Sequence, residues 1–219
     1  ALGGGEVPAR VRIGLAVLIT VLIVPSLPPM PAVDPLSTDS IFISLQQLLI
    51  GVAMGLMVLL VFNAVTLAGE SIAITMGLGF ALMNDPQNGV QVPTVSQFYL
   101  VLATLLFLAL DGHHQVLLLL SSSFTLMPVG QSLGPDSLWQ MVSWAGVIFS
   151  GALSIALPAL AAMLTVNMVM GVITRAAPQM NLFSVGFPIT MTVGFVAIMF
   201  TLPTFGFSFE SLIRQAQTA

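Results

Sequence analysis

Cysteine and lysine are both absent from this sequence. Without cysteine the chain forms no disulfide, holds no metal through thiolates and carries no cysteine nucleophile. Without lysine, and with four arginines against eight acidic residues, it offers no basic patch for nucleic acid or for anionic lipid headgroups. Charged residues make up only 5% of the chain, against roughly 25% in a soluble domain, which excludes an ordinary soluble protein.

Apolar residues dominate what is present, at 57% of the chain. This composition indicates a membrane protein or a subunit buried in a very hydrophobic assembly. The sequence also lacks a phosphate-binding loop, a zinc signature and a nucleophile elbow. His113 and His114 are adjacent, would point about 100° apart on a helix, and show no third ligand beside them. We therefore expect no enzymatic activity, no cofactor and no metal site.

Prolines and polar clusters divide the apolar sequence into helical runs, so we expect an all-α fold of long, kinked and partly broken helices. The expected runs are 11–24, 41–83, 94–110, 116–127, 138–175 and 182–209. As one helix, 41–83 would be ~64 Å long, about twice a hydrocarbon core of roughly 30 Å. This run therefore either bends into a hairpin or extends well beyond a single bilayer crossing. Pro158 and Pro188 are expected to kink their helices, and Asp111 to cap the helix that follows it.

One polar loop separates two of the most apolar runs. Pro86 pushes Asp85 out of the helical region, whereas Asn88 and Gly89 tolerate left-handed backbone angles. The chain can then restart a helix near Pro93. In so apolar a protein, irregular backbone must be covered by protein or line a wet cavity, so this loop is the first candidate for function.

Two isolated charges are further candidates. Glu70 is the only charge in the run 41–83, where a carboxylate is costly unless it is paired or wet. A helix end or a position at the lipid headgroups is the simpler explanation. Arg175 is the only basic residue between Arg12 and Arg214. It either caps the last carbonyls of its helix or pairs with Glu70, with Asp85 or with a partner subunit.

Several motifs occur in an order that closely resembles the FliR family, the single-copy subunits of the flagellar type III export gate, with counterparts in virulence secretion. They are VPARVR at 7–12, MGLGFAL with the following DP, G and VP at 76–93, DGH at 111–113, and TRAAPQMN at 174–181 followed by SVGFP. The resemblance extends over essentially the whole chain. VPARVR resembles the segment after the first helix of the family, so we expect an N-terminal helix to be missing from this chain.

The resemblance implies an architecture and partners. It implies a FliP-like helical part at 1–134 and a FliQ-like helical hairpin at 135–219. It further implies assembly with several copies each of FliP and FliQ, and with FlhB, in the bacterial inner membrane at the flagellar basal body. Part of that assembly would lie on the periplasmic side, in contact with membrane lipid elsewhere, and unfolded export substrates would pass through it.

The resemblance also implies that the loop at about 80–93 projects into the lumen and plugs the closed channel. Apolar side chains there can seal a pore, a glycine can act as a hinge, and hydrophobic constrictions can gate by dewetting. The candidate plug residues are Phe80, Leu82, Met83, Asn84, Asp85, Pro86, Asn88, Gly89, Val90 and Pro93.

Two other functions remain open. An ion-coupled small-molecule transporter could place Glu70, Asp85 and Arg175 at a midplane site, because such proteins use broken helices that end in polar loops. That function predicts an inverted internal repeat, and we find no convincing one. A purely scaffolding subunit, whose loops only brace its neighbours, is the third possibility.

Overall fold

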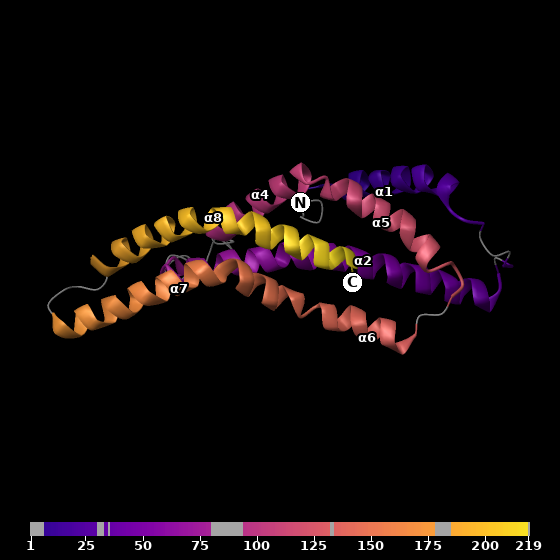
Figure 1. Cartoon of the computed structure of the whole chain (residues 1–219). Helices are drawn as coiled ribbons and strands as arrows, with labels where there is room; N and C mark the ends of the chain where they lie inside the picture. Colours follow the sequence, from indigo (N-terminus) through magenta and orange to yellow (C-terminus); the bar gives the residue numbers. More distant parts are fainter. Residues whose placement is uncertain are drawn as a thin grey trace. The chain divides into compact units, whose positions relative to one another are not determined.

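Helices account for every regular element that the structure, a computed structural model, describes (Figure 1). The described residues are 7–29, 33–34, 36–79, 94–131, 134–177 and 185–218, with backbone only at 135–138 and 218. The elements are α1 (Ala9–Ile23), η1 (Val24–Ser26), α2 (Thr38–Thr75), α4 (Thr94–Ala109), α5 (Gly112–Leu126), α6 (Pro135–Trp144), α7 (Val147–Ala176) and α8 (Phe187–Thr218). The all-α fold class is confirmed.

The run expected as one helix at 138–175 is two helices, and that prediction was wrong. Helix α6 ends at Trp144, and α7 begins at Val147. Between them the amides of Ala145 and Gly146 donate to the carbonyls of Val142 and Ser143, both at 3.1 Å. These hydrogen bonds connect residues three apart instead of four, so the chain forms a tighter, 3₁₀-type turn before α7 begins. Glycine is a poor helix former, which favours a break at this point.

Helix α8 is longer than expected. It continues beyond 209, where the expected apolar run ends, to Thr218 and includes Glu210 and Arg214. Within it, Arg214 Nη2 lies 2.7 Å from Glu210 Oε1, one helical turn away. Charge pairs at this spacing stabilise a helix, so α8 continues from its apolar part into its polar part without a break.

The chain divides into two compact units, each built from segments far apart in the sequence. The first comprises Ala1–Gly55 and Phe107–Gln140, and the second comprises Leu56–Leu106 and Met141–Ala219. In the first unit, the Gln46 side-chain amide donates to the carbonyl of Gln131. The expected FliP-like and FliQ-like parts are likenesses to other proteins, and that division stays a prediction.

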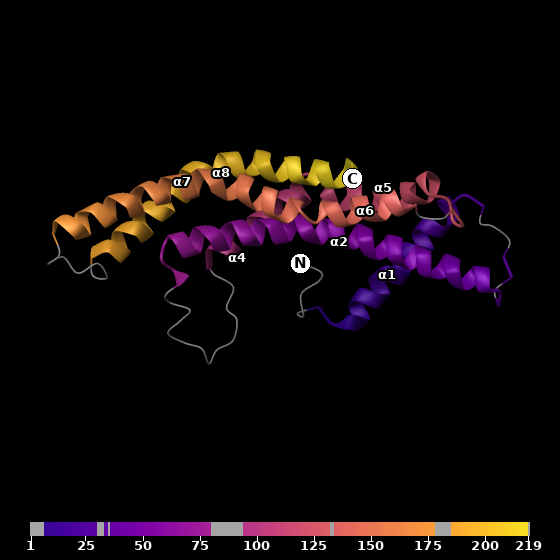
Figure 2. The ribbon, with the colours of Figure 1, turned by 90° about the horizontal axis from the view of Figure 1, so that it is seen from below.

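The second unit holds the aromatic core. The rings of Tyr99 and Phe205 are 5.2 Å apart, those of Phe205 and Phe209 are 5.8 Å apart, and Phe62 meets Phe209 edge-on at 6.0 Å. Helices α7 and α8 lie side by side in both ribbon views (Figures 1 and 2). Gly151 permits this packing, because a Cβ there would lie 2.7 Å from the side chain of Leu212.

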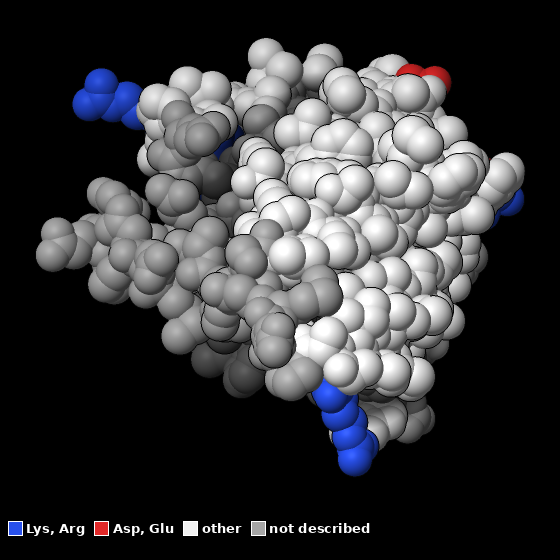
Figure 3. All heavy atoms as spheres, turned by 90° about the vertical axis from the view of Figure 1, so that its left-hand side faces the viewer, with Lys and Arg blue, Asp and Glu red and all other residues white. Residues whose placement is uncertain are grey.

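Most of the apolar surface is left uncovered by the chain itself. Helix α1 has no buried residue, and Val172, Phe200 and Phe207 are 65%, 72% and 77% exposed. Among the described residues, four helices are long and apolar enough to cross a membrane, or five spans if the bent pair α4 and α5 counts as one. Charged side chains occupy only isolated points on the face drawn in Figure 3. The fold is that of a membrane protein.

Candidate functional site at the root of the 80–93 loop

The whole predicted plug loop lies outside the described residues. This holds for Phe80, Leu82, Met83, Asn84, Asp85, Pro86, Asn88, Gly89, Val90 and Pro93. The structure describes the helices on both sides, α2 with the turn that follows it to Gly79, and α4 from Thr94. The geometry of these two stems therefore defines the candidate site.

A tight turn ends α2 just before the loop. Gly77 has a left-handed φ of +83°, its amide donates to the Ile74 carbonyl at 3.0 Å, and the Leu78 amide donates to the Ala73 carbonyl at 3.0 Å. These two bonds around a left-handed glycine form a Schellman motif, which satisfies carbonyls at the end of a helix. Helix α2 thus stops at Thr75, so the run 41–83 is not one continuous helix, and the left-handed Gly77 supplies the stop.

The two stems of the loop are in close contact. Gly69 of α2 faces Ser96 of α4, and a Cβ at position 69 would lie 2.6 Å from the Ser96 Cα. Ser96 is fully buried, and Tyr99, one turn further along α4, is 1% exposed. Small residues at a helix crossing allow two backbones to approach closely. The helices that precede and follow the loop are consequently packed against one another at this crossing.

The hairpin of α7 and α8 supplies hydrogen bonds to the end of α2. Asn167 Nδ2 of α7 donates to the Thr75 carbonyl at 3.3 Å. Thr190 Oγ1 of α8 lies 3.4 Å from the Met76 carbonyl and 3.0 Å from the carbonyl of Phe187 in its own helix. Carbonyls in the last turn have no partner within their helix, so these side chains take over that role.

The side chain of Met76 anchors the same turn by packing into the core. It is fully buried, and a Cβ at Gly194 of α8 would lie 2.4 Å from the Met76 Cγ. Asn167, Thr190 and Gly194 were not among the residues predicted from the sequence. Asn167 offered one signal, as the lone asparagine in the long apolar run that ends at 175.

Replacing Thr190 with valine is expected to loosen this root. The change removes the bond to the Met76 carbonyl while keeping a β-branched side chain, and a hydrogen bond contributes ~1 kcal/mol net. Amide hydrogen exchange at Gly77 and Leu78 should rise by roughly fivefold. Thr192→Val is the matched control, because Thr192 bonds only the carbonyl of Pro188 in its own helix. Equal exchange in both variants would contradict the anchoring role.

The two isolated charges are exposed in the chain as it stands. Glu70 follows Gly69 on α2, and Arg175 lies in the last turn of α7. Neither forms an ion pair with another described residue, so the structure does not bring them together. The fold of this chain alone does not bury either charge, and burial against partner subunits stays a prediction.

The two prolines expected to kink helices occupy different positions. Pro158 lies in the interior of α7, which continues on both sides of it. Pro188 is the second residue of α8, where its missing N–H would have no intrahelical acceptor in any case. Kinks at Pro158 and Pro188 stay predictions.

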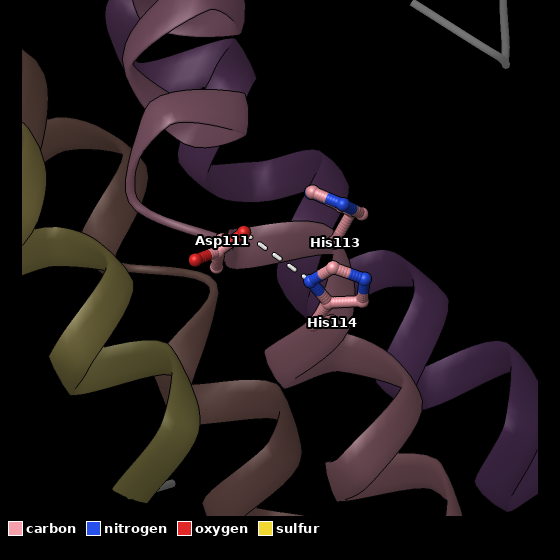
Figure 4. Close-up of side chains that lie close together, drawn as sticks. All are labelled: Asp111, His113 and His114. Carbon is pink, nitrogen blue, oxygen red and sulfur yellow. Dashed lines mark hydrogen bonds and ion pairs between the residues drawn. The ribbon is translucent and has the colours of Figure 1, made fainter.

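Three expectations for residues 111–114 were wrong (Figure 4). Asp111 occupies the N-cap position of α5 but makes no side-chain cap, and its Oδ1 lies 3.2 Å from the Nδ1 of His114. The histidine rings do not diverge, because their centroids are 4.0 Å apart. A third ligand is also close by: Asp111, His113 and His114 each offer one ligand atom within 4.8 Å of the others.

Comparison with known proteins gives a consistent result. A sequence model described as "Bacterial export proteins, family 1" matches residues 1–216. The flagellar biosynthetic protein FliR of Pectobacterium carotovorum is 41% identical over 195 residues, which cover 89% of this chain and 74% of that protein. FliR of Escherichia coli K12 is 38% identical, covering 90% of this chain and 76% of the relative. FliR of Aquifex aeolicus is 31% identical, covering 92% and 78%.

Proposed function

Because this chain belongs to the bacterial export proteins, family 1, and is a membrane-embedded component of the flagellar export apparatus, we propose that it is a subunit of the gate through which unfolded flagellar proteins leave the cell. It acts as a conduit and not as an enzyme. It assembles as a single copy with several FliP and FliQ subunits, and with FlhB, in the inner membrane, with part of the assembly on the periplasmic side. The loop 80–93 plugs the closed channel.

The observation that carries this proposal is the close packing of the helices at the root of the loop. A plug must block ions at rest and yield to a polypeptide during export. It therefore needs a segment held by exchangeable contacts on a base that does not move. The Gly69–Ser96 contact and the bonds from Asn167 and Thr190 to the end of α2 provide such a base. The loop contributes the apolar seal, through Phe80, Leu82 and Met83.

The uncovered apolar surface supports assembly with other membrane subunits. Helices such as α1, with no buried residue, bury their side chains only against lipid or other chains. Glu70 and Arg175 lie on that uncovered surface. A partner subunit that offers the opposite charge would remove the cost of placing either residue in an apolar setting.

The transporter alternative has less support. Its proposed site needs Glu70, Asp85 and Arg175 together, and Glu70 and Arg175 form no ion pair with each other. Asp85 lies outside the described residues. The scaffold alternative differs from a gate only in whether the loop meets the exported polypeptide, so contact with substrate separates the two.

Site-specific crosslinking of a stalled export substrate tests the proposal. A photoreactive residue in place of Met83 or Val90 should crosslink to the substrate, because both lie in the loop that the polypeptide must displace. Phe207 is the control position, since it is 77% exposed on α8, where we expect neighbouring subunits or lipid. A scaffold would give no substrate crosslinks from Met83 or Val90 in the intact assembly.

A further inference from the structure

The two histidines of this chain, which the gate function does not use, lie beside a carboxylate at the bend between α4 and α5. We propose that Asp111, His113 and His114 bind one first-row divalent metal ion, of the class of Zn²⁺ or Co²⁺. The site lies within a single compact unit and does not depend on the gate function.

The distances suit a metal ion. Zinc ligands lie about 2.0–2.2 Å from the ion, so neighbouring ligand atoms around it are ~3–4 Å apart. Asp111 Oδ1 and His114 Nδ1 already meet that spacing at 3.2 Å. The three ligand atoms lie within 4.8 Å of one another, so a shift of about 1 Å completes the set. The side chains of Asp111 and His114 are 71% and 65% exposed, and rotating them displaces no core residue.

Two of the three side chains already interact, because Asp111 Oδ1 and His114 Nδ1 form the hydrogen bond drawn in Figure 4. Nδ1 of His113 is buried and has no hydrogen-bond partner among the described residues, which costs free energy. The His113 ring contacts the His114 ring, with centroids 4.0 Å apart, so the two imidazoles lie next to each other. Asp111 is the one described non-glycine residue with a left-handed φ, at 55°, and its carboxylate faces His114 in place of capping α5.

The donor set selects the class of metal. Two imidazoles and one carboxylate suit Zn²⁺, Co²⁺, Ni²⁺ and Fe²⁺, whereas Mg²⁺ and Ca²⁺ prefer oxygen ligands alone. The positive end of the α5 dipole opposes a cation, and the Asp111 carboxylate offsets that effect. Three protein ligands leave a position for water or for a further ligand.

A bound ion would stiffen the bend between α4 and α5. The two helices meet at 65°, and Asp111 lies before the first turn of α5, whereas His113 and His114 lie within it. Gly112 already fits tightly, because a Cβ there would lie 2.4 Å from the ring of Phe107. An ion shared across Asp111, His113 and His114 would join the connection to the helix and resist straightening.

Cobalt titration of the full chain tests the site. The chain has no cysteine and only these two histidines, so a purification tag without histidine leaves one candidate for imidazole coordination. In detergent, the visible absorption of bound Co²⁺ should saturate at one ion per chain. Mutating a residue that only hydrogen-bonds to a metal ligand already lowers metal affinity about 10–100-fold. Loss of a ligand itself, in His113→Ala, His114→Ala or Asp111→Asn, should therefore weaken binding by about tenfold or more. Asp39→Asn, which removes an exposed carboxylate from α2, should leave binding unchanged.

Two outcomes would overturn the proposal: no saturable Co²⁺ binding by the unmodified chain, or equal affinity in the Asp111→Asn variant. A second measurement needs no variant and so does not depend on how the variants fold. Zn²⁺ should protect His113 and His114 of the unmodified chain from carbethoxylation, as read by mass spectrometry. Unprotected histidines at saturating Zn²⁺ would equally reject the site.

Discussion

Deleting residues 84–90 is expected to make the resting gate leak. The deletion shortens the proposed plug and leaves its two stems intact, since α2 ends at Thr75 and α4 begins at Thr94. The stems stay in contact through Gly69 and Ser96, so the helices around the channel should still assemble. The shortened loop would no longer carry Phe80, Leu82 and Met83 into the constriction that they dewet, so resting ion conductance should rise by about tenfold or more. Ion or small-molecule uptake by cells that carry the assembled gate measures the effect.

A same-length replacement of residues 84–90 by glycine and serine is the matched control. It keeps the span between the stems and the apolar Phe80, Leu82 and Met83. A leak in the deletion but not in the replacement would assign the seal to the reach of the loop and to those three residues. A deletion variant that assembles normally and leaks no more than the unmodified gate would remove the plug role.

Gly69→Val is expected to lower the stability of the chain markedly. Its Cβ would lie 2.6 Å from the Ser96 Cα and 3.0 Å from the Ser96 amide nitrogen, both backbone atoms that cannot rotate away. Helices α2 and α4 must therefore separate, and overpacking of this kind costs typically 1–3 kcal/mol. Thermal unfolding of the isolated chain in detergent measures the loss.

Gly51→Ala on the same helix is the control for Gly69→Val. A Cβ at Gly51 meets nothing within 4 Å, and alanine in place of glycine favours a helix by roughly 1 kcal/mol. The isolated Gly51→Ala chain should therefore unfold at the same or a higher temperature. If Gly69→Val unfolds no earlier than Gly51→Ala, the close helix contact at the root of the loop is not as the structure has it.

The difference between Gly51 and Gly69 shows where sequence reasoning stops. Both glycines lie in one long apolar run, and hydropathy does not distinguish them. Helix α2 is apolar on all sides, so periodicity marks no buried face. Only the position of Ser96, on a helix that follows the loop, makes Gly69 the point of contact. The bonds from Asn167 and Thr190 to the end of α2 depend on the same long-range packing.

The sequence predicted helix breaks well where the cause of the break lies in the residues at the break itself. Prolines and glycines predicted most of the breaks between helices, because they change backbone freedom wherever they stand. They failed at 145–146, where a single glycine within an apolar run was not enough to predict the break. They failed again at Asp111, where the left-handed backbone turns the carboxylate from the expected cap towards His114.

The sequence by itself determined that this is a helical membrane protein of the export family, and where its polar loop lies. Those properties follow from composition, chain breaks and ordered motifs, which need no knowledge of distant contacts. The tertiary structure alone decided which contacts lie at the root of that loop and that the side chains of Asp111, His113 and His114 lie close together. Distances between side chains depend on how helices cross and on backbone angles at single residues. Hydropathy contains no information about either of these.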